Sequence, residues 1–418
     1  MYQAPRGTQD ILPADRPYWR YVTGQMHDVA ALFGLQQIDP PIFEETSLFV
    51  RGVGEGTDIV DKEMYSFQDK GGVEITLRPE FTAGIMRAYI EHGMHVLPQP
   101  VKLYSIGPIF RYERPQAGRF RQHHQFNIEI LGDMNPAVDL EVMSVVWTLL
   151  TRLGYRGLSF QLNSTGCPVC RPCYRQALVD YFAAYEDRLN DVDRRRLTIN
   201  PLRLLDSKEE AAQPLLDDAP HSEDYLCQEC RTHLATLRSY LEALAMPYAI
   251  NFRLVRGLDY YTKTVFEAWA EGIGAQAAVC GGGRYDRLIE MLGGPPTPGI
   301  GFGMGIERVI ASLKQQGVTP PPLPAPQVQV SPLGAAATVP ALKLVRDLRE
   351  AGVGALLAFG GRSLKAQLKS ADRSGVAFTL ILGDQELASG NVVARAMAEG
   401  QQTTVALTEV VAWLRTRV

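Results

Sequence analysis

The 418-residue chain contains no long apolar run and no strong excess of charge of either sign. Without a run of about 20 apolar residues, a membrane-spanning helix is not expected. Residues 1–6 read MYQAPR and lead into polar residues, so we expect no secretory signal peptide and a cytosolic protein. The formal net charge is −4, which means that binding to a polyanion would depend on local basic patches rather than on bulk charge.

Cysteine is also scarce, with six residues in the whole chain. Five of them occur at the spacing C-x-x-C, in the groups Cys167, Cys170, Cys173 and Cys227, Cys230. In a reducing cytosol this spacing favours zinc over disulfides. Free or reactive thiols fit the spacing as well, so we assign no metal ligand from the sequence. The sixth, Cys280, stands among glycines and has the character of a small core residue.

The length and composition predict more than one globular domain. Hydrophobic residues make up 46%, enough for a full core, and 418 residues exceed one typical domain. A proline-rich linker at 321–326 separates residues 1–320 from residues 327–418. The second part alternates strand and helix patterns, which predicts a small α/β domain. In the first part, helical periodicity marks 16–33 and 136–153, and a charged helical segment at about 174–245 has the character of an insertion.

The most polar patterned stretch is residues 111–129. Apolar and polar residues alternate there in two runs, which predicts two strands, and Pro115 and Gly118 place a hairpin loop near 114–120. One hairpin face is apolar, and the other carries Arg111, Gln125 and Glu129. A solvated sheet face and a ligand-binding floor both fit this alternation. Residues 51–70 are glycine-rich and acidic, and we expect a loop there.

A second patterned stretch has glycine at every other position. Residues 299–306 read GIGFGMGI, so a strand there has one bare face and one apolar face. A bare face lets a flat ring approach the backbone. Close packing of the strand on the helix that starts near Arg308 is the alternative. The strict spacing of two differs from the dinucleotide fingerprint G-x-G-x-x-G.

These stretches resemble the motifs of class II aminoacyl-tRNA synthetases, and of the histidyl-tRNA synthetase family in particular. Residues 110–113 (FRYE) with their loop are similar to motif 2, and residues 301–308 (GFGMGIER) to motif 3. Residues 254–261 (LVRGLDYY) and 280–286 (CGGGRYD) resemble the family's signature peptides, and 77–82 and 6–10 also fit. The segment 35–50 resembles motif 1, which in the family builds a homodimer interface around a proline; the nearest match is Pro41.

The resemblance implies an α+β catalytic domain on a mostly antiparallel sheet, with a helical insertion, followed by a C-terminal α/β anticodon-binding domain. The implied reaction is the ATP-dependent ligation of L-histidine to tRNA(His) through a histidyl-adenylate, with Mg²⁺. Arg111 and Arg256 take the catalytic roles, while Arg111, Glu113 and Arg308 bind ATP. The residues implied to bind histidine are Glu80, Thr82, Gln125, Glu129, Tyr260 and Tyr261. Glu80 also fits a plain helix-start acid, and we expect His123 and His124 to be loop or sheet residues.

Two basic segments are the expected tRNA contacts. The hairpin loop supplies Arg114, Gln116 and Arg119, and the helix predicted at 363–373 supplies Arg362, Lys365 and Lys369, with Arg373 on the same face. A solvated basic face is the alternative for the helix. A competing class is a histidine-sensing regulatory paralogue, a subunit of ATP phosphoribosyltransferase, which keeps the fold but loses catalytic residues. This chain retains Arg111, Arg256, Arg308 and a basic last domain, and the 256–261 peptide disfavours another class II synthetase.

Overall fold

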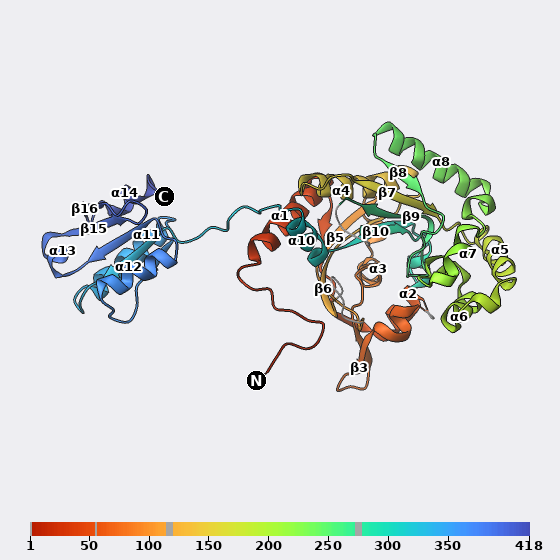
Figure 1. The fold of residues 1–418 in the computed structure, drawn as a ribbon, viewed down its shortest axis with the longest axis horizontal. Coiled ribbons are helices and arrows are strands. Elements are labelled where there is room, and N and C mark those ends of the chain that lie inside the picture. The colour runs from red at the N-terminus through yellow and green to blue at the C-terminus, as the bar shows by residue number, and fades with distance from the viewer. Residues whose placement is uncertain (1, 55–56, 114–119, 272–277) are drawn as a thin grey trace. The chain divides into compact units, whose positions relative to one another are not determined.

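The computed structural model describes residues 2–54, 57–113, 120–271 and 278–418. The chain divides into two compact units, Met1–Pro321 and Pro322–Val418 (Figure 1). Each unit has a hydrophobic core of its own. Among the described helices, none combines the length and the apolar character needed to cross a bilayer. The loop residues Arg114, Gln116 and Arg119 lie outside the described ranges.

The N-terminal unit is built on an eight-stranded sheet. Its strands, in spatial order, are β1 (Gln36–Gln37), β5 (Val101–Phe110), β6 (Gln122–Leu131), β11 (Gly299–Gly305), β10 (Ala278–Arg284), β9 (Thr262–Trp269), β7 (Ser159–Ser164) and β8 (Tyr248–Ile250). The outer pairs β1–β5 and β7–β8 are parallel, and the pairs between them are antiparallel. The sheet is therefore mixed, with antiparallel pairs in its centre and a parallel pair at each edge that the expectation of a mostly antiparallel sheet did not include. Parallel pairing needs a long crossover, and between β7 and β8 the helical insertion supplies it.

The two faces of this sheet are covered by different helices (Figure 1). One face packs against α1 (Arg16–Leu32), α4 (Pro136–Arg152), α8 (Gln228–Ala243) and α10 (Ile306–Gln315). Alternate residues of β6 and β11 point into this core, among them Ile128, Ile130 and Phe302. The opposite face carries a smaller cluster beneath α3 (Thr82–Glu91) and α9 (Leu288–Met291). The polar residues of β6 share this second face.

The hairpin forms as the alternation predicted, but its first strand is shorter. β5 ends at Phe110, so Arg111 and Glu113 follow the strand instead of continuing it. β5 and β6 pair from Val101 with Leu131 to Phe110 with Gln122. Because the strand ends before Arg111, the direction of this side chain is not set by the alternation of the strand. Its Nε donates to the carbonyl of Pro79 (2.8 Å), which fixes the guanidinium beside the sheet.

Residues 51–70 contain regular structure where we expected a loop. Helix α2 (Thr46–Val53) enters this stretch, a π-helix (Ile59–Glu63) follows, and β3 (Tyr65–Gln68) ends it. β3 joins β4 (Glu74–Leu77) and β2 (Phe43–Glu45) in a three-stranded sheet. Phe49, Val53 and Ile59 pack into a small core of their own. The packing of this core explains why the stretch forms helix and strand although its glycine content suggested a loop.

The helical insertion lies between β7 and β8. Its helices are α5 (Arg171–Ala183), α6 (Asp191–Ile199), α7 (Gln213–Asp217) and α8, joined by short 3₁₀ turns. Leu178, Phe182 and Leu216 are fully buried in a separate core. The insertion is therefore a packed subdomain, close to the range of 174–245 read from composition.

The C-terminal unit is a five-stranded sheet with helices. The strands are β13 (Ala355–Leu357), β12 (Val328–Pro332), β14 (Phe378–Leu382), β15 (Asn391–Ala396) and β16 (Gln402–Ala406), and the helices are α11 (Thr338–Glu350), α12 (Leu364–Arg373), α13 (Asp384–Ser389) and α14 (Val410–Arg415). β13, β12 and β14 are parallel, and β15 and β16 continue the sheet antiparallel. Our sequence reading found the α/β alternation but missed β15 and the six-residue α13.

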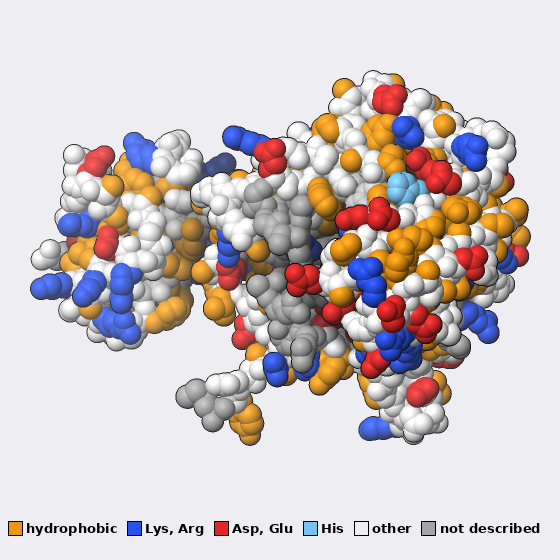
Figure 2. Space-filling view, turned by 45° about the vertical axis from the view of Figure 1, so that its right-hand side comes forward, with side chains coloured by type: hydrophobic (Ala, Val, Ile, Leu, Met, Phe, Trp, Pro, Cys, Tyr) orange, Lys and Arg blue, Asp and Glu red, His pale blue; other side chains and the backbone are white. Residues whose placement is uncertain are grey.

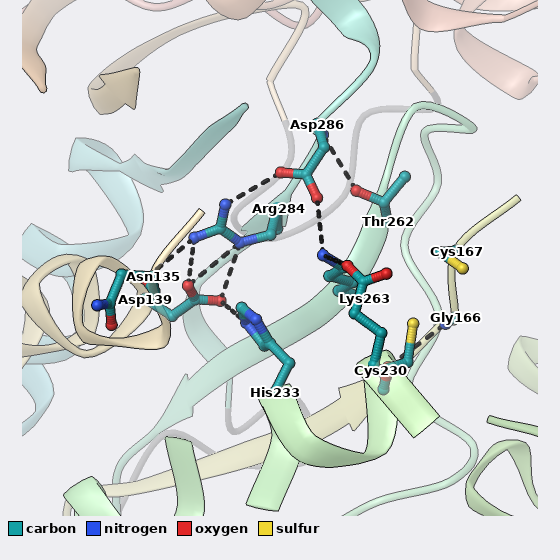
Figure 3. Close-up of polar contacts among 12 residues, drawn as sticks. Asn135, Asp139, Gly166, Cys167, Cys230, His233, Thr262, Lys263, Arg284 and Asp286 are labelled. Carbon is teal, nitrogen blue, oxygen red and sulfur yellow. Dashed lines mark hydrogen bonds and ion pairs between the residues drawn. The ribbon is translucent and has the colours of Figure 1, made fainter. Parts of the chain in front are cut away.

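A buried ion network joins β10 to α4 and α8 (Figure 3). The Arg284 side chain is fully buried and pairs with Asp139, also fully buried, at 2.5 Å. It also pairs with Asp286 (3.0 Å) and donates to the carbonyl of Asp133 (3.1 Å). His233 of α8 completes the network with Nε2 3.1 Å from Asp139. Burial alone would raise the pKa of Asp139, but His233 and Arg284 lower it, so the carboxylate stays ionised.

Candidate active site

The second face of the large sheet holds a strip of glycines from two strands. Register places Gly281 opposite Gly303 and Gly283 opposite Gly301. Side chains from neighbouring elements lie across this strip. A Cβ at Gly301 would be 2.0 Å from Glu129 Oε2, and one at Gly303 would be 2.1 Å from Gln125 Nε2. A Cβ at these positions would therefore displace the polar side chains of β6.

The bare face of β11 is thus only partly open to a ring. At Gly301 and Gly303 the Glu129 and Gln125 side chains lie close to the strand, although both glycines still line the cavity described below. At Gly305 a Cβ would meet only Arg308 Cβ, at 3.9 Å. The open end of the strand is the part at which a flat group has room to approach.

A cavity of about 130 Å³ lies above the glycine strip. All six residues predicted to bind histidine line it, together with both predicted catalytic arginines. Its other lining residues include Asn127, Tyr285 and His123, to which the sequence reading gave no ligand role. Asn127 had a detectable signal, because it lies two positions from Gln125 and from Glu129 on the same strand face. Tyr285 reaches the cavity because it directly follows β10, which pairs with β11 in the sheet.

Two buried carboxyl groups face this cavity. Glu129 accepts from Asn127 Nδ2 (2.9 Å) and from the Tyr285 hydroxyl. Burial raises the pKa of Glu129 to about 7, and neighbouring Glu80 adds to the rise. Glu80 accepts the backbone N–H groups of Thr82 (2.6 Å) and Ala83 (2.7 Å). Glu80 therefore binds the first backbone N–H groups of α3, which is the helix-start role considered above. Its side chain also lines the cavity.

Three tyrosines form one wall of the cavity. The Tyr260 ring lies 4.7 Å from that of Tyr261 and 5.6 Å from that of Tyr285, measured between centroids. Burial raises the pKa of each phenol above its ordinary value. The three hydroxyls therefore stay protonated at neutral pH and are able to donate hydrogen bonds.

Several polar atoms at this site have no partner within the protein. Among the described residues, the buried atoms His123 Nδ1, Gln125 Oε1 and Arg256 Nε have no hydrogen-bond partner. Buried polar atoms are nearly always paired, because an unmade bond costs about 1–3 kcal/mol. Three such atoms around one cavity indicate that the site is shaped to receive a polar ligand.

Arg256 lies where the cavities of the site meet. It lines the 130 Å³ cavity, a neighbouring cavity of about 210 Å³ and a larger one of about 650 Å³. Its Nη1 donates to Glu267 Oε1 (2.6 Å), and Trp269 Nε1 holds the second oxygen of that carboxylate (3.1 Å). Burial would lower the pKa of Arg256, but Tyr261 and Glu267 raise it, so the guanidinium stays charged. Glu267, which orients Arg256, was not found from the sequence.

The remaining nucleotide-site candidates line the two other cavities. Arg308 lines both, Glu113 lines the 650 Å³ cavity, and Arg111 lines that cavity and the 130 Å³ one. Insertion residues, including Arg196, Arg203 and Lys208, line the 650 Å³ cavity from the other side. The insertion therefore borders this cavity and adds both basic and acidic groups to it, the acidic ones being Asp193, Asp206 and Glu209.

The two adjacent histidines have different surroundings. His124 faces α10, where its backbone N–H and its Nδ1 each lie 2.9 Å from the Glu307 carboxylate. His123 instead lines the three cavities around Arg256. Burial, with a contribution from Arg111, lowers the pKa of His123 to about 4, so its imidazole is neutral at pH 7. His124 has the sheet role that we expected, whereas His123 borders the site.

The basic residues of the C-terminal unit lie on one exposed side of α12. Arg362, Lys365, Lys369 and Arg373 are all exposed. Arg362 precedes the first helical residue, Leu364, so it extends the face into the loop. Figure 2 shows several Lys and Arg side chains on the visible face of this unit.

The hairpin, the paired glycine strands and the arginines at their cavities define a class II synthetase catalytic domain, followed by an anticodon-binding domain. The family model of histidyl-tRNA synthetase matches residues 7–170 and 175–309, and that of the anticodon binding domain matches residues 327–417. The chain belongs to the histidyl-tRNA synthetase family.

Individual relatives match the chain along its whole length. The Histidine–tRNA ligase of Dehalococcoides mccartyi is 51% identical over 418 residues, which is 100% of both chains. That of Pelotomaculum thermopropionicum is 49% identical over 99% of this chain and 97% of its own. The crystal structure of apo S. aureus histidyl-tRNA synthetase has a TM-score of 0.83 at 37% identity and covers 99% of each chain.

Proposed function

We propose that the chain ligates L-histidine to tRNA(His) in two steps. Histidine and ATP first form a histidyl-adenylate with release of pyrophosphate, and the histidyl group then passes to the tRNA with release of AMP. The observation that carries this proposal is the polar cavity over the glycine strip. It combines two carboxyl groups, three phenols and an unpaired amide oxygen, and it leads directly to Arg256.

The cavity has a complementary group for each polar part of histidine. Gln125 Oε1, which has no hydrogen-bond partner among the described residues, accepts an N–H of the substrate ammonium, with Glu80 and Thr82 beside it. Glu129 accepts the imidazole N–H, and Tyr261, with Tyr260 beside it, serves the other ring nitrogen. A side chain without these ring nitrogens would leave buried polar groups unpaired, which is the strongest basis for rejection.

The arginines serve the transfer of the adenylyl group. An oxygen of the histidine carboxylate attacks the α-phosphorus of ATP, and the bond from that phosphorus to the bridging oxygen of pyrophosphate breaks. Arg111 holds the α-phosphate, and Arg256, oriented by Glu267, stabilises the charge that develops there. Arg308, which lines the 210 Å³ and 650 Å³ cavities, packs by the adenine or holds the γ-phosphate.

Glu113 is the residue that would hold a Mg²⁺ ion bound together with ATP. Magnesium is usually held by one or two carboxylates plus substrate phosphates, and Glu113 and Glu63 both line the 650 Å³ cavity beside Arg111. This donor set fits a phosphate-bound ion, with Glu113 as its protein ligand. When bound, the ion neutralises phosphate charge. Arg111 and Arg308, which both line the 650 Å³ cavity, bind the phosphate oxygens.

The tRNA contacts are proposed on both units. Arg362, Lys365 and Lys369 form an exposed basic face for phosphates, and the basic insertion residues at the 650 Å³ cavity lie where an acceptor end would enter. Arg114, Gln116 and Arg119 of the hairpin loop complete the set, although they lie outside the described residues.

We also propose a homodimer that forms through the segment after Pro41. Ile42, which precedes β2, is 44% exposed, and Phe43, the first residue of β2, is 55% exposed; β2 is an edge strand of the small sheet. Exposed apolar residues on a strand edge favour pairing with a second copy. Sedimentation velocity at several concentrations tests this proposal, and a monomer mass at every concentration would contradict it.

The activity is tested by ATP–pyrophosphate exchange with each amino acid in turn. We expect exchange with L-histidine and background levels with the other amino acids. Exchange with a different amino acid would make the chain another class II synthetase. Binding of histidine without any exchange would place it with the regulatory paralogues. Charging of tRNA(His), measured separately, tests the second step.

A further inference from the structure

Four of the six cysteines gather at one point, and none of these four lines the three active-site cavities. Cys167 and Cys170 lie between β7 and α5, and Cys227 and Cys230 lie at the start of α8. Their sulfur atoms all lie within 4.8 Å of one another. Cys173, which shares the C-x-x-C spacing, is exposed on α5 and is not part of the cluster.

The sulfur separations match those of a tetrahedral metal site. They are 3.7 Å for Cys167–Cys170, 3.8 Å for Cys167–Cys227 and 3.8 Å for Cys170–Cys230. Zinc–sulfur bonds of about 2.3 Å in tetrahedral geometry place the sulfurs about 3.8 Å apart. A disulfide requires about 2.05 Å, and all four cysteines are free. These separations are those expected of four thiolates around a single ion.

The surroundings of the cluster also suit a structural metal site. Three of the four thiols are buried and Cys227 is half-buried. The backbone N–H of Cys167 donates to Cys170 Sγ (3.2 Å), a bond that stabilises a thiolate. Both ligand pairs have the C-x-x-C spacing of zinc knuckles, and four sulfurs leave no open coordination position for substrate.

We propose that Cys167, Cys170, Cys227 and Cys230 bind one Zn²⁺ ion as a structural site. The site connects residues 60 positions apart in the sequence and closes the base of the helical insertion. The ion acts as a clasp that holds the two ends of the insertion against the sheet. This assignment does not depend on the ligase activity proposed above.

The cluster is coupled to the histidine pocket by its neighbours in sequence. Arg171 follows Cys170, and its guanidinium donates to the carbonyls of Thr165 (3.1 Å), Gly166 (3.2 Å) and Tyr261. Tyr261 forms part of the pocket wall. Binding of the metal at Cys170 therefore fixes the residue that holds the backbone of this wall.

A second connection runs through Lys263. Its backbone N–H donates to the carbonyl of Gly166 (2.9 Å), and its Nζ lies 2.7 Å from Glu229, which stands between two of the ligands. Figure 3 shows Lys263 between the cysteines and the Arg284 network. The cysteine cluster is therefore connected to the pocket wall through Arg171 and to the Arg284 network through Lys263, whose Nζ lies 3.8 Å from Asp286.

The direct test is the metal content of the full-length protein. The chain is purified from cells grown without added zinc and is analysed by mass spectrometry of its metals. We expect about one zinc per chain, released in step with titration of the thiols by an organomercurial. Exchange with Co²⁺ alone should give the visible bands of tetrahedral cobalt and a thiolate charge-transfer band in the ultraviolet.

Variants separate the cluster from the other cysteines. The double variant C167S/C230S should lose zinc, whereas Cys173→Ser should retain it. If the double variant does not fold, the zinc content and the cobalt spectrum of the unmodified chain decide the question. Zinc removal should also speed proteolysis within the insertion by about tenfold, because local opening becomes easier.

Three results would overturn the proposal. One is zinc far below one per chain together with six thiols that react freely after denaturation, which would make the cluster a set of apolar core thiols. Another is a pair of disulfides found by mass spectrometry. The third is a cobalt spectrum without the tetrahedral thiolate bands.

Discussion

Two buried polar clusters on the same sheet differ in how completely their atoms are paired. Around Arg284, a guanidinium, two aspartates and a histidine satisfy one another at 2.5–3.1 Å. Around Glu129, the carboxyl group has a pKa of about 7, and Gln125 Oε1 has no hydrogen-bond partner among the described residues. Tyr285, next to Arg284 in sequence, belongs to the second cluster through its bond to Glu129.

The difference separates polar residues that hold the fold from those that await a ligand. In the Arg284 cluster, Asp139 and Arg284 keep their ionised forms, because the pKa of Asp139 is lowered and that of Arg284 is raised by the opposite charge. In the Glu129 cluster, no ion pair to the carboxyl group forms among the described residues, and burial raises its pKa. A substrate with an N–H donor and an ammonium supplies what is missing.

The largest effect is expected from breaking the satisfied cluster. Arg284→Met leaves the Asp139 carboxylate buried without its main partner, so we expect the free energy of unfolding to fall by roughly 3–5 kcal/mol. Urea denaturation measures it. Arg287→Met, in an exposed pair three residues on, serves as the control. If both variants lose the same small amount, the Arg284 network does not hold the fold.

Removal of the carboxyl group from the other cluster should damage function instead. Glu129→Ala leaves the imidazole N–H of histidine unpaired, so we expect a loss of roughly 2–4 kcal/mol in kcat/KM for histidine. The KM for ATP should barely change, because Glu129 lies in the 130 Å³ cavity and not among the residues that line the other two. Pyrophosphate exchange with each substrate titrated separately measures both effects, with the exposed Glu91→Ala as control. Weakened ATP with unchanged histidine would move Glu129 to the nucleotide side.

Arg256→Ala should slow adenylate formation by about a hundredfold or more, because one charge aimed at the transition state is lost. Histidine binding should stay within roughly tenfold. Stopped-flow adenylate formation and equilibrium binding give the two values. Arg253→Ala is the matched control, because Arg253 pairs with Asp217 and lines none of the three cavities. Equal losses in binding and in rate would make Arg256 a substrate-positioning residue.

The raised pKa of Glu129 predicts a smaller effect on stability, which depends on pH. Its folded value of about 7 lies above the ordinary value of 4.5, so the folded state holds the proton more tightly. This carboxyl group therefore lowers the free energy of unfolding as the pH rises from about 4.5 to 7. Glu129→Gln should stabilise the protein by about 2–3 kcal/mol at pH 8 and by little at pH 4.5. Thermal denaturation at both pH values measures the gain, and an equal gain at both would contradict the shift.

Local sequence patterns predicted much of this arrangement. The apolar spacing of α1 and α4 and the alternation in β5 and β6 fixed those elements, because each depends on neighbours a few positions away. The same alternation placed Gln125, Asn127 and Glu129 on one face. Motif resemblance then placed Arg111 and Arg256 at the same site, and the structure brings them to the same cavity.

What the sequence left open depends on register between distant segments. Gly281 and Gly303 form one floor only because β10 and β11 pair in that register. Glu267 reaches Arg256 from β9, and Tyr285 reaches Glu129 from the end of β10. Likewise, the choice among five closely spaced cysteines was decided by the fold, which brings together two segments about 60 positions apart.

The smallest effect is expected on α12, where the charges are exposed rather than buried. Lys365 and Lys369 lie on one exposed side of the helix, so replacing both by glutamine should leave adenylate formation and stability unchanged. If each lysine contacts a tRNA phosphate, the variant should bind tRNA(His) a few-fold more weakly, and its slope of log affinity against log salt should become shallower by about 1–2. Filter binding at several salt concentrations measures the slope. Lys343→Gln, an exposed lysine of α11, is the matched control. An unchanged slope would show that this basic face is only solvated, because a surface charge that neutralises no phosphate releases no counterion when tRNA binds.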